Sequence, residues 1–334
     1  MEVKKMSTSQ KLLTFLSSYP EKWFSGNQLA SQLELSRTAV WKGIRLLEEQ
    51  GYSLESRHGL GYRLMIDNQL NATLISQELR LDHQPRIVVY NKVSSTNTIA
   101  KQMLFEDLKK PAVILANQQT AGRGRFDRKF YSPAASGIYM SIALPLSIDE
   151  KVNPGLLTTA TAVAAGRAIK KVFHRQVKYK WVNDLILNNR KCGGILTEAI
   201  TDLESGRIAS LVIGIGLNLT LDTKKMPTEL LGKAGAISKS DNSKRNLLIA
   251  EFINFFFDIY RNYRSGDFLE EYRRHSIVLG KRIAIVVNRK KIIGKVEKIN
   301  SQGAILLKSD NNQLLTISSG EIIKLNLLEG KYYE

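Results

Sequence analysis

The sequence predicts an α+β protein made of three successive parts. Residues 1–66 combine helix-spaced apolar residues with a short hairpin pattern. Residues 67–270 contain buried strand patterns with few helices between them, and residues 271–334 contain short strands at close spacing. Runs of strands that are not each followed by a helix are typical of α+β folds. At 334 residues the chain is long enough for several domains with sizeable cores.

The first part predicts three helices and a hairpin. Apolar residues recur at helical spacing in the segment 12–19. Ser25–Gln28 is a capping box, in which a serine is followed three residues later by a glutamine, and it opens a short second helix. Two short alternating strands, 52–57 and 62–66, enclose a turn that contains two glycines.

The third helix has an apolar face and a cationic face. Its apolar stripe follows i, i+4, i+7 spacing through Val40, Ile44 and Leu47, and a serine can cap its first turn. This order of helices and hairpin predicts a winged helix-turn-helix, whose recognition helix enters the major groove of DNA. The residues expected to contact DNA are Gly26, Ser36, Arg37, Thr38, Lys42, Arg45, Arg57 and His58. A three-helix bundle with a merely solvated outer face is the alternative.

The middle part predicts a mixed sheet. Its expected strands are 86–91, 112–117, 137–144, 191–198 and 209–215. Helices are expected to begin near Thr98 and to cover 158–173 and 247–260, and the polar residues 67–71 are expected to form a linker. No Gly-x-Gly-x-x-Gly opens a strand-to-helix unit, so a dinucleotide-binding domain is not expected.

A loop rich in glycine and arginine follows the expected strand 112–117. It reads Gly122-Arg123-Gly124-Arg125, and on an extended backbone its two arginines would point to the same side. Glycine allows the backbone to approach a ligand closely, and guanidinium groups bind anions through forked hydrogen bonds. The loop is therefore a candidate anion-binding site, with a solvated basic loop as the alternative. It is not a P-loop, because no Gly-Lys-Ser/Thr follows at the required spacing.

Three other polar segments lie at or near the ends of expected strands. Ser94–Asn97 follows the strand 86–91 and can cap a helix, but it also suits a neutral polar ligand such as a urea. Lys180–Asp184 joins a cationic strand to a polar turn. Lys191–Gly194 places a lysine beside a glycine pair, which gives a ligand close access to the backbone.

Four of these segments, in this order, resemble the catalytic domain of biotin protein ligases: Ser95–Asn97, Gly122–Arg125, Lys180–Asp184 and Lys191–Gly194. With the winged helix in front, the chain resembles the bifunctional biotin ligase and biotin operon repressor family along nearly its whole length. The resemblance implies that biotin and ATP, with Mg2+, form biotinyl-5′-AMP. It also implies transfer of biotin to a lysine of the biotin carboxyl carrier domain of acetyl-CoA or pyruvate carboxylase. The short strands expected at 282–287, 292–299, 304–308 and 314–317 predict a small antiparallel barrel, and the resemblance implies that it is an SH3-like C-terminal domain.

The resemblance implies roles for individual residues of these motifs. The catalytic residues would be Lys191, Arg125, Lys180 and Asp184. The residues that bind biotin and the adenylate would be Ser95, Thr96, Asn97, Gln119, Gly122, Arg123, Gly124, Arg125, Lys191 and Asn218. Cations suit this chemistry, because they offset the repulsion between a carboxylate and the phosphate that it attacks. Asp184 either positions a magnesium-bound triphosphate or simply caps a turn.

The sequence departs from the family pattern at three positions. Phe130, expected on the adenine side, stands where many members have tryptophan. Val182 interrupts the usual Lys-Trp-Pro-Asn-Asp, and Cys192 follows the key lysine where an aliphatic residue is common. None of these changes removes a charge that the chemistry needs. Cys192 is expected to be a small core residue rather than a nucleophile, because no histidine stands near it in the sequence.

The composition of the chain indicates which classes of partner it binds and where in the cell it is located. The net charge of +18 predicts acidic partners such as nucleic acid or nucleotides. A single cysteine excludes an internal disulfide and a cysteine-based zinc cluster, and no group of metal-binding residues is expected. The polar N-terminus is not typical of a signal peptide, and the most apolar run, 247–260, is too short and too polar to span a bilayer. We therefore expect a cytoplasmic protein without membrane contact.

The resemblance also implies a mode of regulation. The adenylate would act as corepressor, favour a homodimer and so tighten binding to a palindromic operator. Two other functions stay open at this point. A biotin-sensing transcription factor without catalysis would share the scaffold, although the retained Arg125, Lys180 and Lys191 argue against it. A lipoate ligase would share the catalytic fold, although the winged helix and the glycine-arginine loop argue against it.

Overall fold

A computed structural model of the chain describes residues 6–19, 21–49, 52–65, 69–147, 150–202, 204–240 and 243–326. The chain divides into two compact units, Met1–Asn71 and Ala72–Glu334. The predicted domain boundary between residues 66 and 67 lies outside the described residues. Among the described residues, none of the helices is both long enough and apolar enough to span a lipid bilayer.

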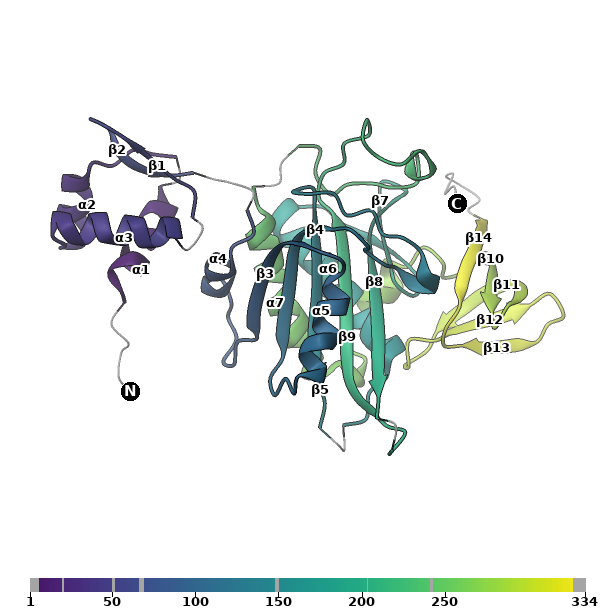
Figure 1. Cartoon of the computed structure of the whole chain (residues 1–334). Helices are drawn as coiled ribbons and strands as arrows, with labels where there is room; N and C mark the ends of the chain where they lie inside the picture. The colour runs from purple at the N-terminus through teal and green to yellow at the C-terminus, as the bar shows by residue number, and fades with distance from the viewer. Residues whose placement is uncertain are drawn as a thin grey trace. The chain divides into compact units, whose positions relative to one another are not determined.

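The first unit has the predicted order of three helices and a hairpin (Figure 1). Its elements are α1 Thr8–Ser18, α2 Gly26–Leu33, α3 Arg37–Glu49, β1 Leu54–Arg57 and β2 Gly61–Leu64. The predicted capping box of α2 is confirmed. The Ser25 hydroxyl accepts a hydrogen bond from the Gln28 N–H at 3.2 Å, and the Gln28 side-chain oxygen accepts one from the Ser25 N–H at 2.7 Å.

Helix α3 has the two faces that its sequence predicts. Val40, Ile44 and Leu47 are buried, whereas the cationic side chains of the opposite face are exposed. The Ser36 hydroxyl accepts a hydrogen bond from the Ala39 N–H at 3.1 Å. This bond satisfies one of the backbone donors that a helix leaves free in its first turn. An apolar core and an N-cap therefore hold the cationic face of α3 in place.

The second unit is built on a seven-stranded mixed sheet with strand order β3-β4-β5-β9-β8-β7-β6. Its strands are β3 Arg86–Val93, β4 Ala112–Gln119, β5 Gly137–Pro145, β6 Lys178–Lys180, β7 Asp184–Leu187, β8 Arg190–Thr201 and β9 Ile208–Asn218. In the described part of this sheet β3 and β4 pair in parallel, and the other neighbouring strands pair antiparallel. The predicted mixed sheet is therefore confirmed.

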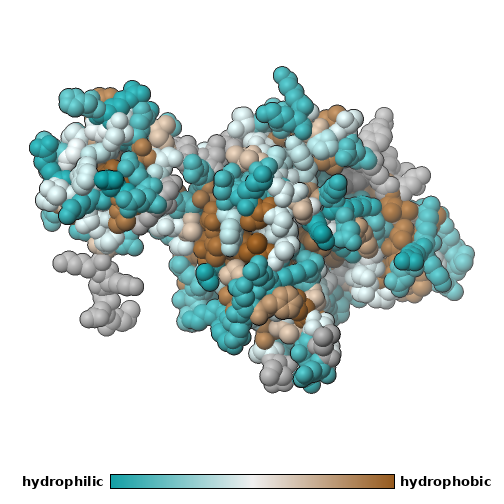
Figure 2. Space-filling view, in the orientation of Figure 1, coloured by the Kyte–Doolittle hydropathy of each residue, from teal (hydrophilic) through white to brown (hydrophobic). Residues whose placement is uncertain are grey.

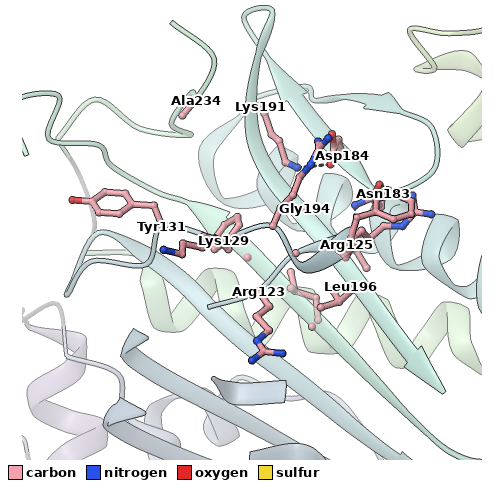
Figure 3. Close-up of a pocket in the computed structure, with 18 of the residues that line it drawn as sticks. Arg123, Arg125, Lys129, Tyr131, Asn183, Asp184, Lys191, Gly194, Leu196 and Ala234 are labelled. Carbon is pink, nitrogen blue, oxygen red and sulfur yellow. Dashed lines mark hydrogen bonds and ion pairs between the residues drawn. The ribbon is translucent and has the colours of Figure 1, made fainter. Parts of the chain in front are cut away.

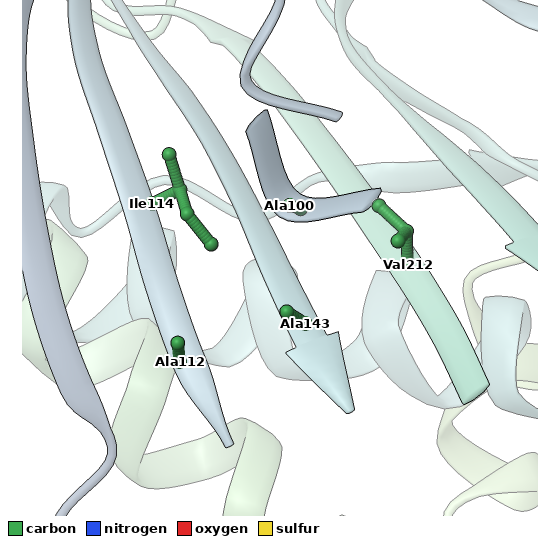
Figure 4. Close-up of a cluster of buried hydrophobic side chains, with 5 residues drawn as sticks. All are labelled: Ala100, Ala112, Ile114, Ala143 and Val212. Atoms are coloured by element: carbon green, nitrogen blue, oxygen red, sulfur yellow. The ribbon is translucent and has the colours of Figure 1, made fainter. Parts of the chain in front are cut away.

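Helices cover both faces of the large sheet. On one face α5, Thr96–Phe105, packs through small side chains, and a buried cluster lies between helix and sheet (Figure 4). The cluster consists of Ala100, Ala112, Ile114, Ala143 and Val212. Behind the sheet in Figure 1 lie α6, Pro154–Phe173, and α7, Arg245–Tyr260. Figure 2 shows an apolar area of surface on the α5 side, over β3 and β4.

Helix α5 begins earlier than predicted. It starts at Thr96 rather than near Thr98, and its N-cap, Ser95, makes no side-chain capping bond. Instead the side-chain oxygen of Gln119, on β4, accepts a hydrogen bond from the Thr96 N–H at 2.8 Å. A distant residue thus satisfies a free donor at the start of the helix, which local capping rules do not anticipate. Two short helices, α4 Ala72–Gln77 and α8 Leu269–Arg274, have no counterpart in the sequence prediction.

A five-stranded antiparallel sheet follows α8, with strand order β13-β12-β11-β10-β14. Its strands are β10 Arg282–Val287, β11 Lys290–Ile299, β12 Ile305–Ser309, β13 Leu314–Ile317 and β14 Glu321–Asn326. The first four agree with the predicted strands within about two residues, whereas β14 was not predicted. The indole N–H of Trp181 donates to the carbonyl oxygen of Gly303 at 2.8 Å. This hydrogen bond ties the turn before β12 to the turn between β6 and β7 of the large sheet.

Candidate functional site

A cavity of about 510 Å³ lies beside the β4–β5 connection, the start of β8, the end of β9 and the start of β14 (Figure 3). The predicted site residues that line it are Ser95, Thr96, Asn97, Gln119, Arg123, Gly124, Arg125, Phe130, Lys180, Asp184, Lys191 and Asn218. Gly122 does not line the cavity, and a Cβ at this position would lie 2.7 Å from the carbonyl oxygen of Phe130. The fold thus brings five separate sequence segments to one place.

Thr96 and Asn97 form a buried polar wall of the cavity at the start of α5. The side-chain oxygen of Gln119 lies 2.8 Å from the Thr96 nitrogen and 3.2 Å from the Thr96 hydroxyl, and both groups donate to it. The Asn97 amide donates to Glu198 at 2.6 Å, and its oxygen lies 2.5 Å from the hydroxyl of the fully buried Ser141. These bonds orient uncharged donors and acceptors, which suits a neutral polar ligand.

Two glycines of β9 make room for side chains of the cavity. A Cβ at Gly214 would collide with the side-chain oxygen of Asn97. A Cβ at Gly216 would lie 2.5 Å from the ring of Phe130. That ring also contacts Tyr139 edge-on, with the ring centroids 6.4 Å apart. Glycine at these two positions therefore lets a polar side chain and an aromatic ring lie directly on the sheet.

Residues 120–136, which connect β4 to β5, are called the ligand loop below. The loop folds back on itself, because the Gly124 N–H donates to the Arg128 carbonyl at 2.7 Å. The Phe130 N–H likewise donates to the Gly122 carbonyl at 2.9 Å. The backbone groups of the two glycines thus hold the loop in a hairpin-like shape.

Arg125 connects the ligand loop to both sheets of the second unit. Its guanidinium donates to the side-chain oxygen of Asn183 at 3.3 Å and to the carbonyl oxygen of Gly320 at 3.1 Å. Burial lowers the pKa of the Arg125 guanidinium, while the nearby carboxylates of Asp184 and Glu321 act in the opposite direction. A partly buried cation that faces the cavity is well placed to bind an anion there.

Arg123 has a different environment, contrary to the expected alternation. Its side chain is exposed and lies 3.8 Å from Asp127, and Figure 3 shows it pointing away from Arg125. A short 3-10 turn over Arg125–Asp127 bends the loop, so the backbone is not extended there. Arg128, which was not predicted, forms an ion pair with Glu321 at the start of β14.

Lys191 and Asp184 form an ion pair that lines the cavity, with Lys191 Nζ 2.6 Å from Asp184 Oδ1 (Figure 3). A Cβ at Gly194 would lie 3.3 Å from Lys191 Nζ, so the absent side chain leaves space beside the ammonium. The backbone of Lys191 is fixed by a hydrogen bond from its N–H to the carbonyl of Lys233 at 2.9 Å. The next residue, Cys192, is fully buried, as predicted, and burial raises the pKa of its thiol to about 12.

One carboxylate of the cavity, that of Asp184, is a candidate ligand for Mg2+. In the part of the chain that the structure describes, no group of three or more His, Cys, Asp and Glu side chains could hold a metal ion. Mg2+ usually keeps several waters and binds through one or two carboxylates together with substrate phosphates. Asp184 fits this role, because its carboxylate lines the cavity beside the cations expected to bind phosphate.

Several residues that support the cavity have no sequence prediction. Glu198 holds both the Asn97 amide and, at 2.7 Å, the ammonium of Lys101. Ser141 is a buried polar residue in an otherwise apolar strand, which is a signal that could have identified it. Glu321 left no such signal, because β14 itself was not predicted.

The residues expected to contact DNA lie in the first unit. Those exposed on or next to α3 are Ser36, Arg37, Thr38, Lys42 and Arg45, those exposed at the hairpin are Arg57 and His58, and Gly26 is half-buried. Trp41, which was not predicted, is 49% exposed on α3, and the Arg45 guanidinium lies 5.3 Å from the centre of its ring. Arg57 pairs with Glu55 at 2.8 Å, so part of its charge is satisfied within the hairpin.

Three segments of the chain match known protein families. Residues 89–218 match the Biotin/lipoate A/B protein ligase family, residues 8–63 match an HTH domain, and residues 278–325 match the Biotin protein ligase C terminal domain. The order of these matches is the order of the helical unit, the large sheet and the small sheet.

Whole-chain comparisons agree with the segment matches. The chain is 31% identical over 324 residues to the bifunctional ligase/repressor BirA of Bacillus subtilis strain 168, covering 95% of this chain and 98% of that protein. It is 29% identical over 307 residues to the protein of the same name from Escherichia coli K12, covering 90% and 92%. The fold is similar to that of the biotin protein ligase from Aquifex aeolicus in complex with biotin and ATP. That comparison gives a TM-score of 0.59 at 22% identity and covers 72% of this chain and 98% of the other.

Proposed function

Because this chain belongs to the family of bifunctional biotin ligases and repressors, we propose that it joins biotin to a carrier protein and represses transcription. The observation that carries the proposal is one cavity that combines a neutral polar wall with several cations, among them Arg125, Lys180 and Lys191. The polar wall around Thr96 and Asn97 suits the uncharged ureido ring of biotin. The cations suit the biotin carboxylate and the phosphates of ATP.

The first step forms biotinyl-5′-AMP. A carboxylate oxygen of biotin attacks the α-phosphorus of ATP, the bond to the bridging oxygen of the β-phosphate breaks, and pyrophosphate leaves. Both reactants are anions, so the protein must offset their repulsion in the transition state. Lys191 and Arg125 both line the cavity and supply this charge, together with Lys180. Asp184 would hold Mg2+ together with the triphosphate, and the ion would neutralise the leaving pyrophosphate.

The second step transfers biotin. The neutral amine of a lysine attacks the acyl carbon of the adenylate, AMP leaves, and the amine loses a proton as the amide forms. The acceptor lysine belongs to a biotin carboxyl carrier domain, that of acetyl-CoA or pyruvate carboxylase. The ligand loop covers the adenylate between the two steps, since its Arg125 and Arg128 bind Gly320 and Glu321 across the cavity.

Repression uses the first unit. The adenylate acts as corepressor, and a homodimer presents two α3 helices to a palindromic operator. Support for the dimer comes from β3, which is an edge strand of the large sheet and lies under the apolar surface area in Figure 2. The proposed location is the cytoplasm, because the proposed function requires these substrates and operator DNA in the same compartment.

The decisive experiment measures incorporation of labelled biotin into a carrier domain with ATP and Mg2+, with lipoate as competitor. We expect ATP-dependent transfer that lipoate does not reduce. Tight biotin binding without transfer would identify a non-catalytic biotin sensor, and competition by lipoate would identify a lipoate ligase. A lack of both binding and transfer would refute the proposed ligand as well as the reaction.

A further inference from the structure

Arg245, the first residue of α7, is a buried cation that does not line the cavity. Its side chain is only 1% exposed. Burial lowers the pKa of the Arg245 guanidinium to about 10, so the group keeps its positive charge at neutral pH. Fully buried arginines are rare, because the charge loses its hydration and must be compensated by good hydrogen bonds. The hydrogen bonds of this side chain therefore indicate what it does.

The guanidinium of Arg245 bridges the two ends of the ligand loop. Nη1 donates to the side-chain oxygen of Asn117 at 3.0 Å, and Nη2 donates to the carbonyl oxygen of Gly137 at 2.8 Å. Asn117 lies near the end of β4, where the chain leaves the sheet, and Gly137 is the first residue of β5, where the chain returns. Because the guanidinium is planar and rigid, it sets the separation of these two acceptors.

The returning limb of the loop is packed tightly next to Gly137. The Tyr139 hydroxyl donates to the carbonyl oxygen of Pro133 at 2.9 Å, and the Ser136 carbonyl accepts from the Leu219 N–H at 3.0 Å. The ring of Tyr139 contacts Phe130 edge-on. A displacement of Gly137 would therefore pass to the loop residues that face the cavity.

We propose that Arg245 is a positioning residue that clamps the departure and the return of the ligand loop. Through Asn117 and Gly137 it sets the closed arrangement in which Arg125 and Phe130 cover the adenylate. It touches neither reactant. Lysine does not replace it, because a single ammonium lacks the planar fork that bonds two acceptors at a fixed separation. This inference rests on the proposed ligase function, since the adenylate is the ligand that the loop retains.

The test compares Arg245→Lys with the wild-type protein and with Arg80→Gln. Arg80 is the matched control, because its guanidinium also binds α7, through Glu251 at 2.7 Å, and its described contacts do not include the ligand loop. Enzyme-bound adenylate is formed from labelled biotin and ATP, and its dissociation is followed after addition of excess unlabelled biotin. We expect dissociation to be about tenfold faster in Arg245→Lys, as for the loss of one charge-assisted hydrogen bond, and unchanged in Arg80→Gln.

A second readout does not depend on the adenylate. Trypsin cleaves after arginine and lysine, of which the loop has several, so its rate of cleavage in the unliganded protein reports how firmly the loop is held. We expect faster cleavage in Arg245→Lys than in the wild type and in Arg80→Gln at matched thermal stability. If Arg245 does not clamp the loop, trypsin should cleave the wild type, Arg245→Lys and Arg80→Gln at equal rates.

A third variant guards against a folding defect at the buried site. Asn117→Ala removes one acceptor of the clamp and leaves the arginine in place, so it should accelerate adenylate dissociation in the same direction. The adenylate should dissociate from the double variant Arg245→Lys/Asn117→Ala no faster than from Arg245→Lys alone, because both changes break the same interaction. The proposal is overturned if both single variants retain the adenylate like the wild type, or if Arg80→Gln loses it equally fast. Failure of the wild type to form adenylate would refute the ligase function instead, and trypsin cleavage would still decide on the clamp.

Discussion

Single side chains carry the chemistry of the cavity, and Arg125 is the cation that connects the ligand loop to Asn183 and Gly320. Replacement by alanine removes a cation together with its bonds to Asn183 and Gly320. We expect Arg125→Ala to release the adenylate about 10–100-fold faster, because charge-assisted hydrogen bonds are among the stronger ones. The rate is measured by dissociation of labelled adenylate. Arg261→Ala is the control, since Arg261 is exposed and pairs with an exposed aspartate, and an unchanged rate in Arg125→Ala would remove this residue from the mechanism.

Gly216 tests the position of the adenine. A Cβ at Gly216 would lie 2.5 Å from the Phe130 ring, so Gly216→Ala must displace that ring. Overpacking of this kind typically costs about 1–3 kcal/mol, and we expect a rise of about tenfold or more in the KM for ATP with a smaller change for biotin. Gly155→Ala is the matched control, because the nearest atom to its Cβ would lie at 3.5 Å. An unchanged KM for ATP in Gly216→Ala would place the adenine elsewhere.

At this scale the sequence predicts polar and charged residues of the cavity but not the residues that orient them. Ser95, Lys191 and Arg125 stand in short motifs that can be read directly from the chain. Glu198 orients Asn97 from 101 positions away, and Gly320 binds Arg125 from 195 positions away. Such partners are set by the pairing of strands, which no local pattern contains.

At the scale of elements, a buried carboxylate of α7 forms ion pairs with cations from two neighbouring segments. Glu251 of α7 lies 2.7 Å from Arg80, which follows α4, and 2.8 Å from Lys171 of α6, and its side chain is 4% exposed. The hydrogen bond from Arg80 is the largest cause that lowers the pKa of Glu251 below its ordinary value of 4.5. The pairs therefore stabilise the fold fully above that value, and the stabilisation is lost as the pH falls through the lowered pKa.

Glu251→Gln should accordingly be less stable than the wild type at neutral pH, by about 1–3 kcal/mol, because the charge-assisted hydrogen bonds are weakened while the half-exposed Arg80 and Lys171 stay solvated. The difference in unfolding free energy should shrink as the pH falls below 4.5 and through the lowered pKa of Glu251, because the wild-type carboxylate then becomes protonated and loses its charge as well. Chemical denaturation across this pH range measures it. Glu270→Gln, at an exposed pair with Arg274, should show little difference at any pH, and a constant deficit of Glu251→Gln would contradict the linkage.

Elements with strong periodicity are predicted well, and elements that depend on neighbours are not. The apolar stripe of α3 is buried as expected, and α6, Pro154–Phe173, includes the helix expected over 158–173. The start of α5 was placed two residues late, because Gln119 of another strand satisfies its first donor. Strand β14 was missed, although its edge position beside β10 completes the small sheet and brings Glu321 to the cavity.

On the scale of the whole molecule, DNA binding and ligation belong to separate compact units. The double variant Lys42→Ala/Arg45→Ala removes two exposed cations of α3. We expect loss of operator binding, at least about tenfold at moderate salt, with unchanged biotin transfer, because phosphate contacts dominate affinity for DNA. Binding is measured by fluorescence anisotropy of labelled operator DNA, and transfer by labelled biotin. Lys109→Ala, at an exposed pair in the second unit, is the control for charge alone, and a parallel loss of transfer would contradict the separation.

The order of the parts along the chain was predictable at this scale, because each part has its own pattern of periodicity. The assembly of the cavity was not, since it joins segments from residue 95 to residue 323. The sequence identified the chemistry of the site through motifs, and the folded chain shows how the small sheet completes it.

The three tryptophans are distributed so that the protein carries its own optical reporters. Trp41 is exposed on α3, whereas Trp181 is buried, lines the cavity and binds Gly303 through its indole N–H. An indole in water emits at longer wavelength than one in an apolar, hydrogen-bonded enclosure. The red side of the emission spectrum therefore reports DNA at the first unit, and the blue side reports ligand in the second. DNA binding and ligand binding can therefore both be followed in a single sample by intrinsic fluorescence, without a label.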